Sequence, residues 1–193
     1  MPSPLSPKIR DALSLAEEFD EVCFRNLAYQ YATKSQALST GSKRTGGRYN
    51  PKDEFGALYL SLNLHTCLEE VVQAQSLSAI EIAPKLPRVD VAIKVRLSKI
   101  LNLTNPVIQR AIGITEADLI IASDLEDQGW HSLQRSGRVE STQLIGRLTR
   151  EAGFEALLVP SAKFPGKNLV VFYPENILPT SQILLLNEDR LPD

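Results

Sequence analysis

The chain has 193 residues, of which 43% are hydrophobic, so it is long enough to bury the core of one domain and short for two. Its formal net charge of -2 gives no general attraction to nucleic acid or to an anionic membrane surface. These values predict a single-domain protein with no direct nucleic-acid binding and no membrane association.

The N-terminal sequence indicates where in the cell the protein is located, and the numbers of cysteines and histidines indicate whether it can bind a metal. Residues 1–7 contain three prolines and no apolar signal-peptide core, and no later stretch approaches the ~20 apolar residues that cross a bilayer, so we expect a cytoplasmic protein. Two cysteines, Cys23 and Cys67, and two histidines, His65 and His131, are too few for a typical metal cluster. We expect no metal site, reduced thiols and structural histidines.

The start of the chain predicts a helix, a strand and a loop. In the N-terminal helical segment 1–20, Ser6 can cap a helix that has Pro7 in its first turn, and the apolar side chains fall on one face for packing on the domain. A short strand is predicted at Val22–Arg25. Residues 33–47 are rich in Ser, Thr, Lys and Gly with few apolar anchors, which predicts a mobile surface loop.

The next predicted elements are a strand over residues 57–61 and a helix over residues 64–72. At about 100° per residue, the apolar side chains of the helix centre near Leu64, so that Glu69 points about 150° away and Glu70 about 110° away. Glu69 is therefore predicted to face water. Glu70 is predicted to lie at the edge of the buried face, where it can reach into a cleft.

The remaining elements follow no regular order. Residues 88–97 alternate between apolar and charged side chains, which is typical of a half-buried strand. Helices are then predicted from Asn105-Pro106 to Gly113, after the capping pair Thr115 and Asp118, and from Ser141 to Gly153, with strands at 156–159, 169–173 and 183–186. This irregular order favours an α+β fold over a doubly wound parallel sheet.

Three side chains on successive elements suit the chemistry of a nucleotide. Arg48 offers a fork of donors for phosphate, and the preceding Gly46 and Gly47 can leave backbone amides free for the same group. Tyr59 offers a ring face for a flat, cationic heterocycle. Glu70 can bond a sugar hydroxyl and balance a carbocation. Together they match an enzyme that breaks the glycosidic bond of a nucleotide.

Short motifs occur in a fixed order along about residues 22 to 175. They are Phe24-Arg25, Gly46-Gly47-Arg48-Tyr49-Asn50, Leu58-Tyr59-Leu60, Leu68-Glu69-Glu70-Val71, Gly129-Trp130, Thr142-Gln143 with Gly146, Val159-Pro160-Ser161-Ala162, and Asn168. This ordered set resembles the RES domain family, named for its Arg, Glu and Ser residues and found in bacterial toxins of toxin-antitoxin pairs that consume NAD+.

The resemblance implies a fold, a domain and an activity. The fold would be a compact mixed domain like that of ADP-ribosyltransferases, with a split sheet around an NAD-shaped cleft, over residues 21–193. The reaction would cleave the bond between nicotinamide and ribose in NAD+, which is then a substrate and not a cofactor. The acceptor stays open: water would give a glycohydrolase, inorganic phosphate a phosphorylase, and a protein side chain an ADP-ribosyltransferase.

The resemblance also implies roles for the candidate residues. Arg48, with Arg25 assisting, would hold the pyrophosphate, and Tyr59 would lie against the nicotinamide ring. Glu70 would bond the ribose hydroxyl and oppose the developing positive charge.

Two later residues and a partner follow from the same resemblance. Ser161 would hydrogen-bond the nicotinamide amide or the ribose, because no histidine or lysine motif is placed to make it a nucleophile. Asn168 would also bind NAD+, and Trp130 is expected in the core or the cleft wall.

A toxin must be held inactive in its host, so we expect a cognate antitoxin, commonly with a helix-turn-helix DNA-binding part. We expect it to order the loop 33–47 and to pair with Arg48.

Two other classes of protein remain open at this point. An inactive module would keep the fold and an antitoxin-binding cleft without turnover, and the presence of the full set of site residues argues against it. An RNA-cleaving toxin would use Lys43, Arg44 and Arg48 as a phosphate patch, and the net acidity and the shortage of histidines argue against that.

Overall fold

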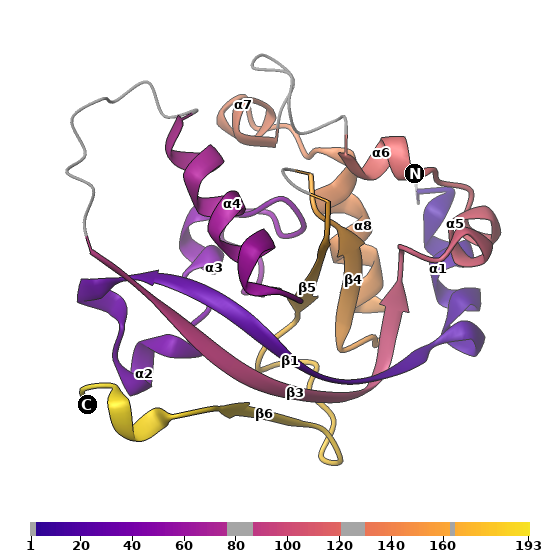
Figure 1. Ribbon diagram of the computed structural model, residues 1–193. Helices are drawn as coiled ribbons and strands as arrows, with labels where there is room; N and C mark the ends of the chain where they lie inside the picture. The colour runs from indigo at the N-terminus through magenta and orange to yellow at the C-terminus, as the bar shows by residue number, and fades with distance from the viewer. Residues whose placement is uncertain (1–2, 77–86, 121–129, 163–164) are drawn as a thin grey trace.

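The computed structural model describes residues 3–76, 87–120, 130–162 and 165–193 (Figure 1). The α-helices are α1 (Leu5–Asp11), α2 (Lys34–Ala37), α3 (Ser42–Thr45), α4 (Leu64–Ser76), α5 (Pro106–Ile112), α6 (Glu116–Ile120), α7 (Trp130–Arg135) and α8 (Ser141–Glu151). The strands are β1 (Glu17–Ala28), β2 (Leu58–Ser61), β3 (Arg88–Asn102), β4 (Ala156–Pro160), β5 (Lys167–Val171) and β6 (Gln182–Leu185). Short 3-10 turns lie at Ala12–Leu15, Tyr29–Tyr31 and Glu188–Arg190.

The strands form one mixed sheet that closes on itself. Their order is β1-β2-β5-β4-β3-β6, and an additional pairing of β1 with β3 closes the first five strands into a small barrel-like ring. The β3–β4 pair is parallel and the other pairs are antiparallel. β1 meets β2 at the single pair Phe24↔Ser61, so the ring is held most weakly there. The predicted α+β domain with a mixed sheet is confirmed.

Apolar side chains on both faces of the sheet build two clusters. Leu58, Leu60 and Leu169 point into the ring, whereas Leu157 and Val170 point outward to the helices. Because successive side chains of a strand face opposite ways, a strand that is buried on both faces must be apolar throughout. This explains the unbroken apolar runs of β4 and β5.

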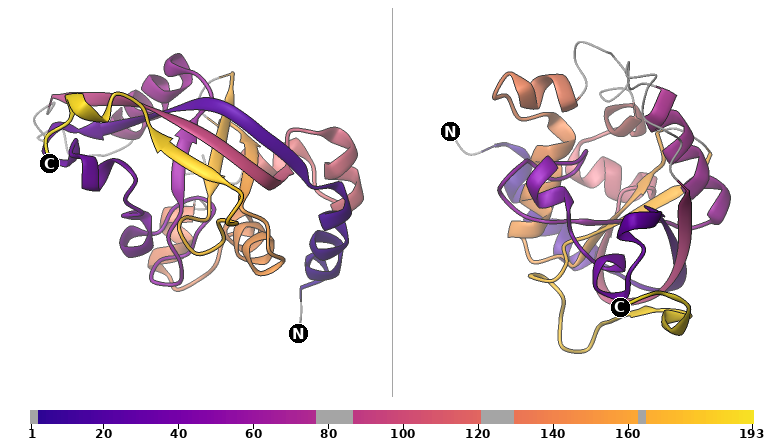
Figure 2. Two further views of the ribbon diagram at one scale, coloured as in Figure 1. Left: turned by 90° about the horizontal axis from the view of Figure 1, so that it is seen from below. Right: turned by 90° about the vertical axis from the view of Figure 1, so that its left-hand side faces the viewer.

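The helices lie on two sides of the sheet. α1, α5, α6 and α8 gather against one another and against β4 (Figure 1). α4 packs instead on β1 and β2. Figure 2 shows the long ribbon of β1 and β3, with β6 beside it, on the side of the molecule opposite to α8.

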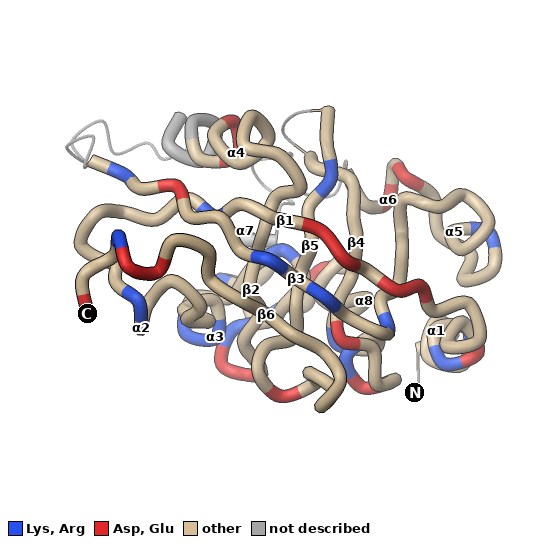
Figure 3. The backbone as a smooth tube through the Cα atoms, turned by 60° about the horizontal axis from the view of Figure 1, so that its bottom comes forward, with Lys and Arg blue, Asp and Glu red and all other residues tan. Residues whose placement is uncertain are grey.

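Basic and acidic residues lie along the β1–β3 ribbon (Figure 3). Asp20 on β1 lies 2.6 Å from Lys94 Nζ and 3.2 Å from an Arg96 guanidinium nitrogen on β3. The hydrogen bond from Lys94, followed by that from Arg96, lowers the pKa of Asp20. Since Asp20 is exposed, water screens these pairs and they contribute little to stability.

The N-terminal helix differs from its prediction. α1 begins at Leu5, and its N-cap is Pro4 without a side-chain cap, so the predicted cap at Ser6 is wrong. The Leu5 N–H donates instead to Ser3 Oγ at 3.3 Å. Ile9 is fully buried in the cluster beside α8. The domain division at residue 20 stays a prediction; β1 itself begins at Glu17.

The segment 33–47 is not the unanchored loop that its composition predicts. It contains α2, which Thr33 caps by accepting a hydrogen bond from the Gln36 N–H at 3.2 Å, and also α3. Ala37 is fully buried, and the Ser42 hydroxyl donates to the Ala57 carbonyl oxygen at 2.7 Å. The prediction fails because the polar residues of this segment act as caps and anchors.

Helix ends elsewhere follow the predicted capping chemistry. The Asn105 side chain accepts from the Val107 N–H at the start of α5, and Thr115 and Asp118 bond reciprocally at the start of α6. α8 begins at Ser141 as predicted, although its cap is the buried Glu140.

α8 approaches the turn at Tyr49 closely, and Gly146 makes this approach possible. A Cβ at Gly146 would lie 1.8 Å from the Tyr49 carbonyl oxygen, a distance that no real contact shows. The glycine costs helix stability, by about 1 kcal/mol relative to alanine. We infer that close packing of α8 on this turn outweighs that cost.

We therefore expect Gly146→Ala to destabilise the protein by about 2 kcal/mol, although alanine is the better helix former, because α8 must move away from Tyr49. The measurement is the free energy of unfolding in urea. Gly41→Ala is the matched control, since its Cβ would meet nothing within 4 Å. A Gly146→Ala variant as stable as the control would show that α8 does not need this close contact.

Candidate active site

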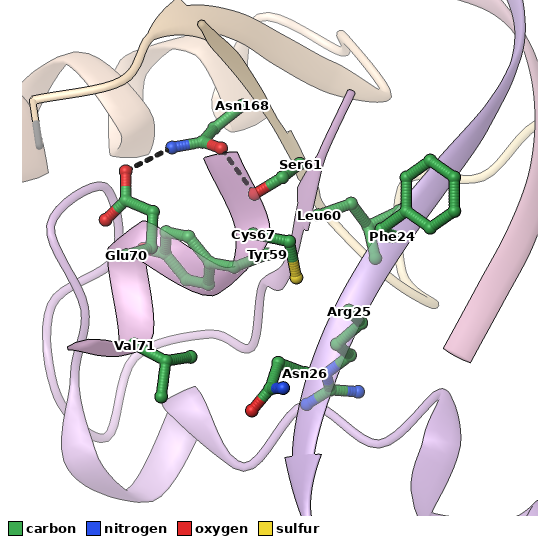
Figure 4. Close-up of a pocket in the computed structure, with 10 residues that line it drawn as sticks. All are labelled: Phe24, Arg25, Asn26, Tyr59, Leu60, Ser61, Cys67, Glu70, Val71 and Asn168. Carbon is green, nitrogen blue, oxygen red and sulfur yellow. Dashed lines mark hydrogen bonds between the residues drawn. The ribbon is translucent and has the colours of Figure 1, made fainter. Parts of the chain in front are cut away.

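A pocket of about 220 Å³ lies between α4 and the strands β1, β2 and β5, at the place where β1 and β2 share their single pair (Figure 4). It is lined by Arg25 from β1, Tyr59 and Ser61 from β2, Glu70 from α4 and Asn168 from β5. Pockets for whole drug-sized ligands measure ~300–1,000 Å³. This pocket is therefore smaller than one that holds a whole drug-sized ligand.

The Glu70 carboxylate is held by two donors on one of its oxygens. The Ser161 hydroxyl donates to Oε1 at 2.6 Å, and Asn168 Nδ2 donates to the same oxygen at 2.7 Å. Ser161 directly follows β4, and Asn168 pairs with Val159 across the β4–β5 ladder, so the antiparallel register brings both donors to one spot. Such bonds to an ionised group are strong and fix its orientation. Among the described residues, Oε2 is the oxygen left to meet a ligand.

The face of α4 that turns to the sheet differs from the predicted one. Leu64 and Leu68 are 42% and 40% exposed, whereas Thr66 and Cys67 are buried. The helix packs on β1 and β2 through the face of Thr66 and Cys67, one turn before Glu70, so the predicted centre of the buried face at Leu64 is wrong. Glu70 lines the pocket, and Glu69 is not among the lining residues.

Tyr59 connects the pocket to the turn that carries Arg48. Its hydroxyl accepts from the Tyr49 N–H at 2.9 Å and donates to Asn50 Oδ1 at 2.8 Å. The Asn50 amide in turn donates to the Phe55 carbonyl oxygen at 3.0 Å. Burial raises the pKa of Tyr59, which keeps the phenol neutral.

Arg48 lies outside the pocket lining, next to α6. Its Nη2 donates to the Ile120 carbonyl oxygen at 3.2 Å, and its guanidinium carbon lies 5.7 Å from the centroid of the Tyr49 ring. Its buried Nε finds no hydrogen-bond partner in the described part of the chain. Burial raises the pKa of Tyr49 to about 12; the charge of Arg48 opposes this effect, and the charges of Glu140 and Glu70 add to it.

The glycines before Arg48 do not leave their amides free, which corrects the prediction made from their position. The Gly46 N–H donates to the Ser42 carbonyl oxygen at 2.7 Å, and the Gly47 N–H to the Asn50 carbonyl oxygen at 2.8 Å. A Cβ at Gly47 would lie 2.5 Å from the Tyr59 hydroxyl. Gly47 is therefore needed to make room for Tyr59.

The first turn of α8 holds the same segment from the other side. The Thr142 hydroxyl donates to the Arg48 carbonyl oxygen at 2.6 Å, and Gln143 Nε2 donates to the Gly47 carbonyl oxygen at 3.0 Å. Both side chains are buried, at 1% exposure. The Thr142-Gln143 motif, together with Gly146, therefore has a structural role: it fixes the backbone at Arg48.

Arg25 is the cation that faces the pocket (Figure 4). Its Nη1 donates to the Ala37 carbonyl oxygen at 2.7 Å, which ties β1 to α2. Burial lowers the pKa of Arg25 to about 10, so the side chain stays charged at neutral pH. The structure thus brings five of the six predicted site residues together, and Arg48 is the one that lies apart.

The other candidate groups have no chemical role that the structure supports. Cys23 and Cys67 are free and buried, and burial raises the pKa of their thiols to about 12 and about 11, so both are unreactive. His65 lies on an exposed part of α4, and the side chains of Trp130 and His131 fall outside the described residues.

The described ranges contain neither a metal site nor a membrane-spanning helix. Within residues 3–76, 87–120, 130–162 and 165–193, no three His, Cys, Asp or Glu side chains gather as a metal site would require. No helix in those ranges is long and apolar enough to cross a membrane.

Sequence reasoning did not place Ser61 or Cys67 at the pocket, which both of them line. Ser61 lies two residues after Tyr59, so the alternation along a strand places both on the same face. Cys67 precedes Glu70 by three positions and shares its helix face. Both positions can be inferred from the sequence once Tyr59 and Glu70 are assigned to the site.

These observations define the class of the protein: an α+β domain with a closed mixed sheet, whose pocket presents an oriented carboxylate, an arginine and a tyrosine to a polar ligand. The family model described as the RES domain matches residues 22–183, and the chain belongs to that family.

Known relatives carry this fold. The chain is 33% identical over 108 residues to the NAD(+) phosphorylase MbcT of Mycobacterium tuberculosis and to that of Mycobacterium bovis. The match covers 53% of this chain and 54% of each relative, so the chain spans about half the length of the curated relatives it matches. A chain in the crystal structure of the M. tuberculosis MbcT-MbcA toxin-antitoxin complex is similar with a TM-score of 0.70 and 27% identity, over 95% of this chain and 90% of that chain.

We expect removal of the Tyr49 hydroxyl and removal of the Tyr59 hydroxyl to have different effects on the free energy of unfolding. The buried Tyr49 hydroxyl has no hydrogen-bond partner among the described residues, so Tyr49→Phe should leave the free energy of unfolding unchanged or raise it by about 1 kcal/mol. Tyr59→Phe is the matched comparison and should lower it by about 2 kcal/mol, because two bonded groups lose their partner. Equal losses in urea denaturation would contradict this difference.

Proposed function

We propose that the protein cleaves the bond between nicotinamide and ribose in NAD+ and acts as the toxin of a toxin-antitoxin pair. The observation that carries the proposal is the Glu70 carboxylate, held by Ser161 and Asn168 beside Arg25 and Tyr59 in one pocket. Membership of the RES domain family and the similarity to NAD(+) phosphorylase MbcT support it.

To catalyse this cleavage, the enzyme mainly has to orient the substrate and stabilise the positive charge that develops on it. When the glycosidic bond breaks, its electron pair leaves with nicotinamide, which becomes neutral, and positive charge develops on the ribose. Glu70 Oε2 would accept a hydrogen bond from a ribose hydroxyl and oppose that charge. A fixed carboxylate in this role contributes a few kcal/mol, on the order of 10² to 10³ in rate.

The other pocket residues have roles that their contacts allow. The Tyr59 ring would lie against the nicotinamide ring, a cation until the bond breaks. The Ser161 hydroxyl donates to Glu70, and the same residue would border the nicotinamide amide or the ribose. Asn168 would hold Glu70 and border the substrate. Arg25, nearer to the pocket, would take the first phosphate, and Arg48 the more distant part of the pyrophosphate.

The finer details of fold, acceptor and location belong to the same proposal. β1 and β2 diverge from a single pair at the pocket, which is where the split of an ADP-ribosyltransferase-like sheet would lie. The activity named for MbcT makes inorganic phosphate the favoured acceptor over water or a protein side chain. The reaction would take place in the cytoplasm, over the proposed domain 21–193.

Product analysis tests this proposal. The purified protein is incubated with NAD+ in the presence and absence of inorganic phosphate, and nicotinamide and the ADP-ribose product are measured. We expect phosphate-dependent nicotinamide release with ADP-ribose 1-phosphate as the second product. Release that does not depend on phosphate, with free ADP-ribose, would make the protein a glycohydrolase; no release from folded protein would refute NAD+ cleavage.

The two neighbouring glutamates provide a matched pair of variants. Glu70→Gln should lower the rate of nicotinamide release at least about 10²-fold, because the neutral amide cannot oppose the developing charge. Glu69→Gln removes the same charge one residue away, on a side chain that does not line the pocket, and should stay within about twofold of wild type. Similar rates in the two variants would remove Glu70 from the mechanism.

We further propose a cognate antitoxin with a helix-turn-helix DNA-binding part, supported by the similarity to a chain of the MbcT-MbcA toxin-antitoxin complex. α2 and α3 already anchor the segment 33–47, so the antitoxin is not needed to order that segment. A partner segment that pairs with Arg48 and covers the pocket would block NAD+.

Expression in a bacterial host tests the toxin role. The wild-type chain should arrest growth with loss of cellular NAD+, the Glu70→Gln chain should be harmless at equal protein level, and co-expression of the product of the neighbouring gene should restore growth. Unchanged growth and unchanged NAD+ with soluble wild-type protein would favour the inactive module.

A further inference from the structure

The side chain of Ser61 completes a chain of hydrogen bonds that ends on Glu70 (Figure 4). Its hydroxyl donates to Asn168 Oδ1 at 2.8 Å, and the same amide donates through Nδ2 to Glu70 Oε1 at 2.7 Å. Ser61 and Asn168 are direct cross-strand partners in the β2–β5 ladder. Ser61 also forms, with Phe24, the single pair between β1 and β2 that closes the ring.

The chemistry of an amide explains why this contact matters. A carboxylate only accepts hydrogen bonds, so Asn168 must turn its NH2 end to Glu70 and its carbonyl oxygen away. That oxygen meets a donor at Ser61, which is 6% exposed and therefore has little water to bond instead. Without the Ser61 hydroxyl, the amide oxygen would lose its partner, and only Glu70 would oppose rotation of the amide.

We infer that Ser61 is a positioning residue: through Asn168 it fixes the direction of the Glu70 carboxylate in the pocket. This inference rests on the proposed function in that it names what Glu70 needs for that reaction. Ser61 acts on the carboxylate and not on NAD+, so its loss should affect turnover more than substrate binding.

Steady-state kinetics of nicotinamide release test the inference. Ser61→Ala should lower kcat about tenfold and change KM for NAD+ less than about twofold, whereas Ser61→Thr, which keeps the hydroxyl, should recover most of the rate. Thr66→Val is the matched control, because valine keeps the shape by which this fully buried residue packs α4, and the lost Thr66 hydroxyl has no partner among the described residues. Its kcat should equal that of wild type.

A double variant separates positioning from a general structural effect. In an Asn168→Ala background the path from Ser61 to Glu70 is already broken, so adding Ser61→Ala should cause no further loss of kcat. An unchanged kcat in folded Ser61→Ala, or a full additional loss in the Asn168→Ala background, would overturn the inference. If Ser61→Ala does not fold, Ser61→Cys, of similar size but a weak donor, replaces it with the same expected outcome.

A measurement without turnover keeps this test independent of the proposed function. The side-chain amide protons of Asn168 should exchange with solvent faster in Ser61→Ala than in wild type by NMR, and at the wild-type rate in Thr66→Val. If the wild-type protein releases no nicotinamide, the proposed function fails, and the exchange rates alone decide the positioning. Equal exchange in Ser61→Ala and wild type would overturn it.

Discussion

The hydrogen bonds from Ser161 and Asn168 to Glu70 Oε1 are the interaction on which the site depends. A half-buried carboxylate needs donors, and two neutral donors on one oxygen satisfy that need and leave the other oxygen without a donor in the described part of the chain. The three residues come from the end of β4, from β5 and from α4. The site therefore exists only when the sheet and the helix are in register.

The architecture supplies that register. β4 and β5 are buried on both faces, so a slip of their pairing would exchange two sets of apolar side chains, and the register is strongly fixed. α4 is held on β1 and β2 by the face of Thr66 and Cys67, which directs Glu70 to the ladder. On the far side, α8 and Tyr59 fix the turn at Arg48 through its backbone, and the Arg48 guanidinium donates to the Ile120 carbonyl oxygen of α6.

Sequence patterns predicted the parts of the fold that depend on local chemistry. The caps at Asn105 and Thr115 are examples, as is the apolar alternation that begins at Arg88. They underestimated the lengths of β1 and β3. These strands extend because they pair with each other, and such a contact between distant segments cannot be seen in a short stretch of sequence. They also placed the buried face of α4 near Leu64, since hydrophobicity alone does not reveal that a threonine and a cysteine face the sheet while two leucines stay exposed.

The sequence predicts which residues belong to the candidate site but not how they contact one another. Glu70, Ser161 and Asn168 were named from motifs, but the bonds that join them follow from strand pairing. The use of Gly47 to accommodate Tyr59, and the place of Ser61 behind Asn168, required the structure, because each depends on a contact between distant segments.

A crystal structure of the Glu70→Gln variant with NAD+ tests the central claim most directly, because the slowed reaction would preserve the substrate. We expect the nicotinamide ring against Tyr59 and a ribose hydroxyl within hydrogen-bond distance of the substituted side chain, with the pyrophosphate on the side of the arginines. NAD+ bound elsewhere, or bound in the pocket with its ribose turned away from that side chain, would contradict the role of Glu70.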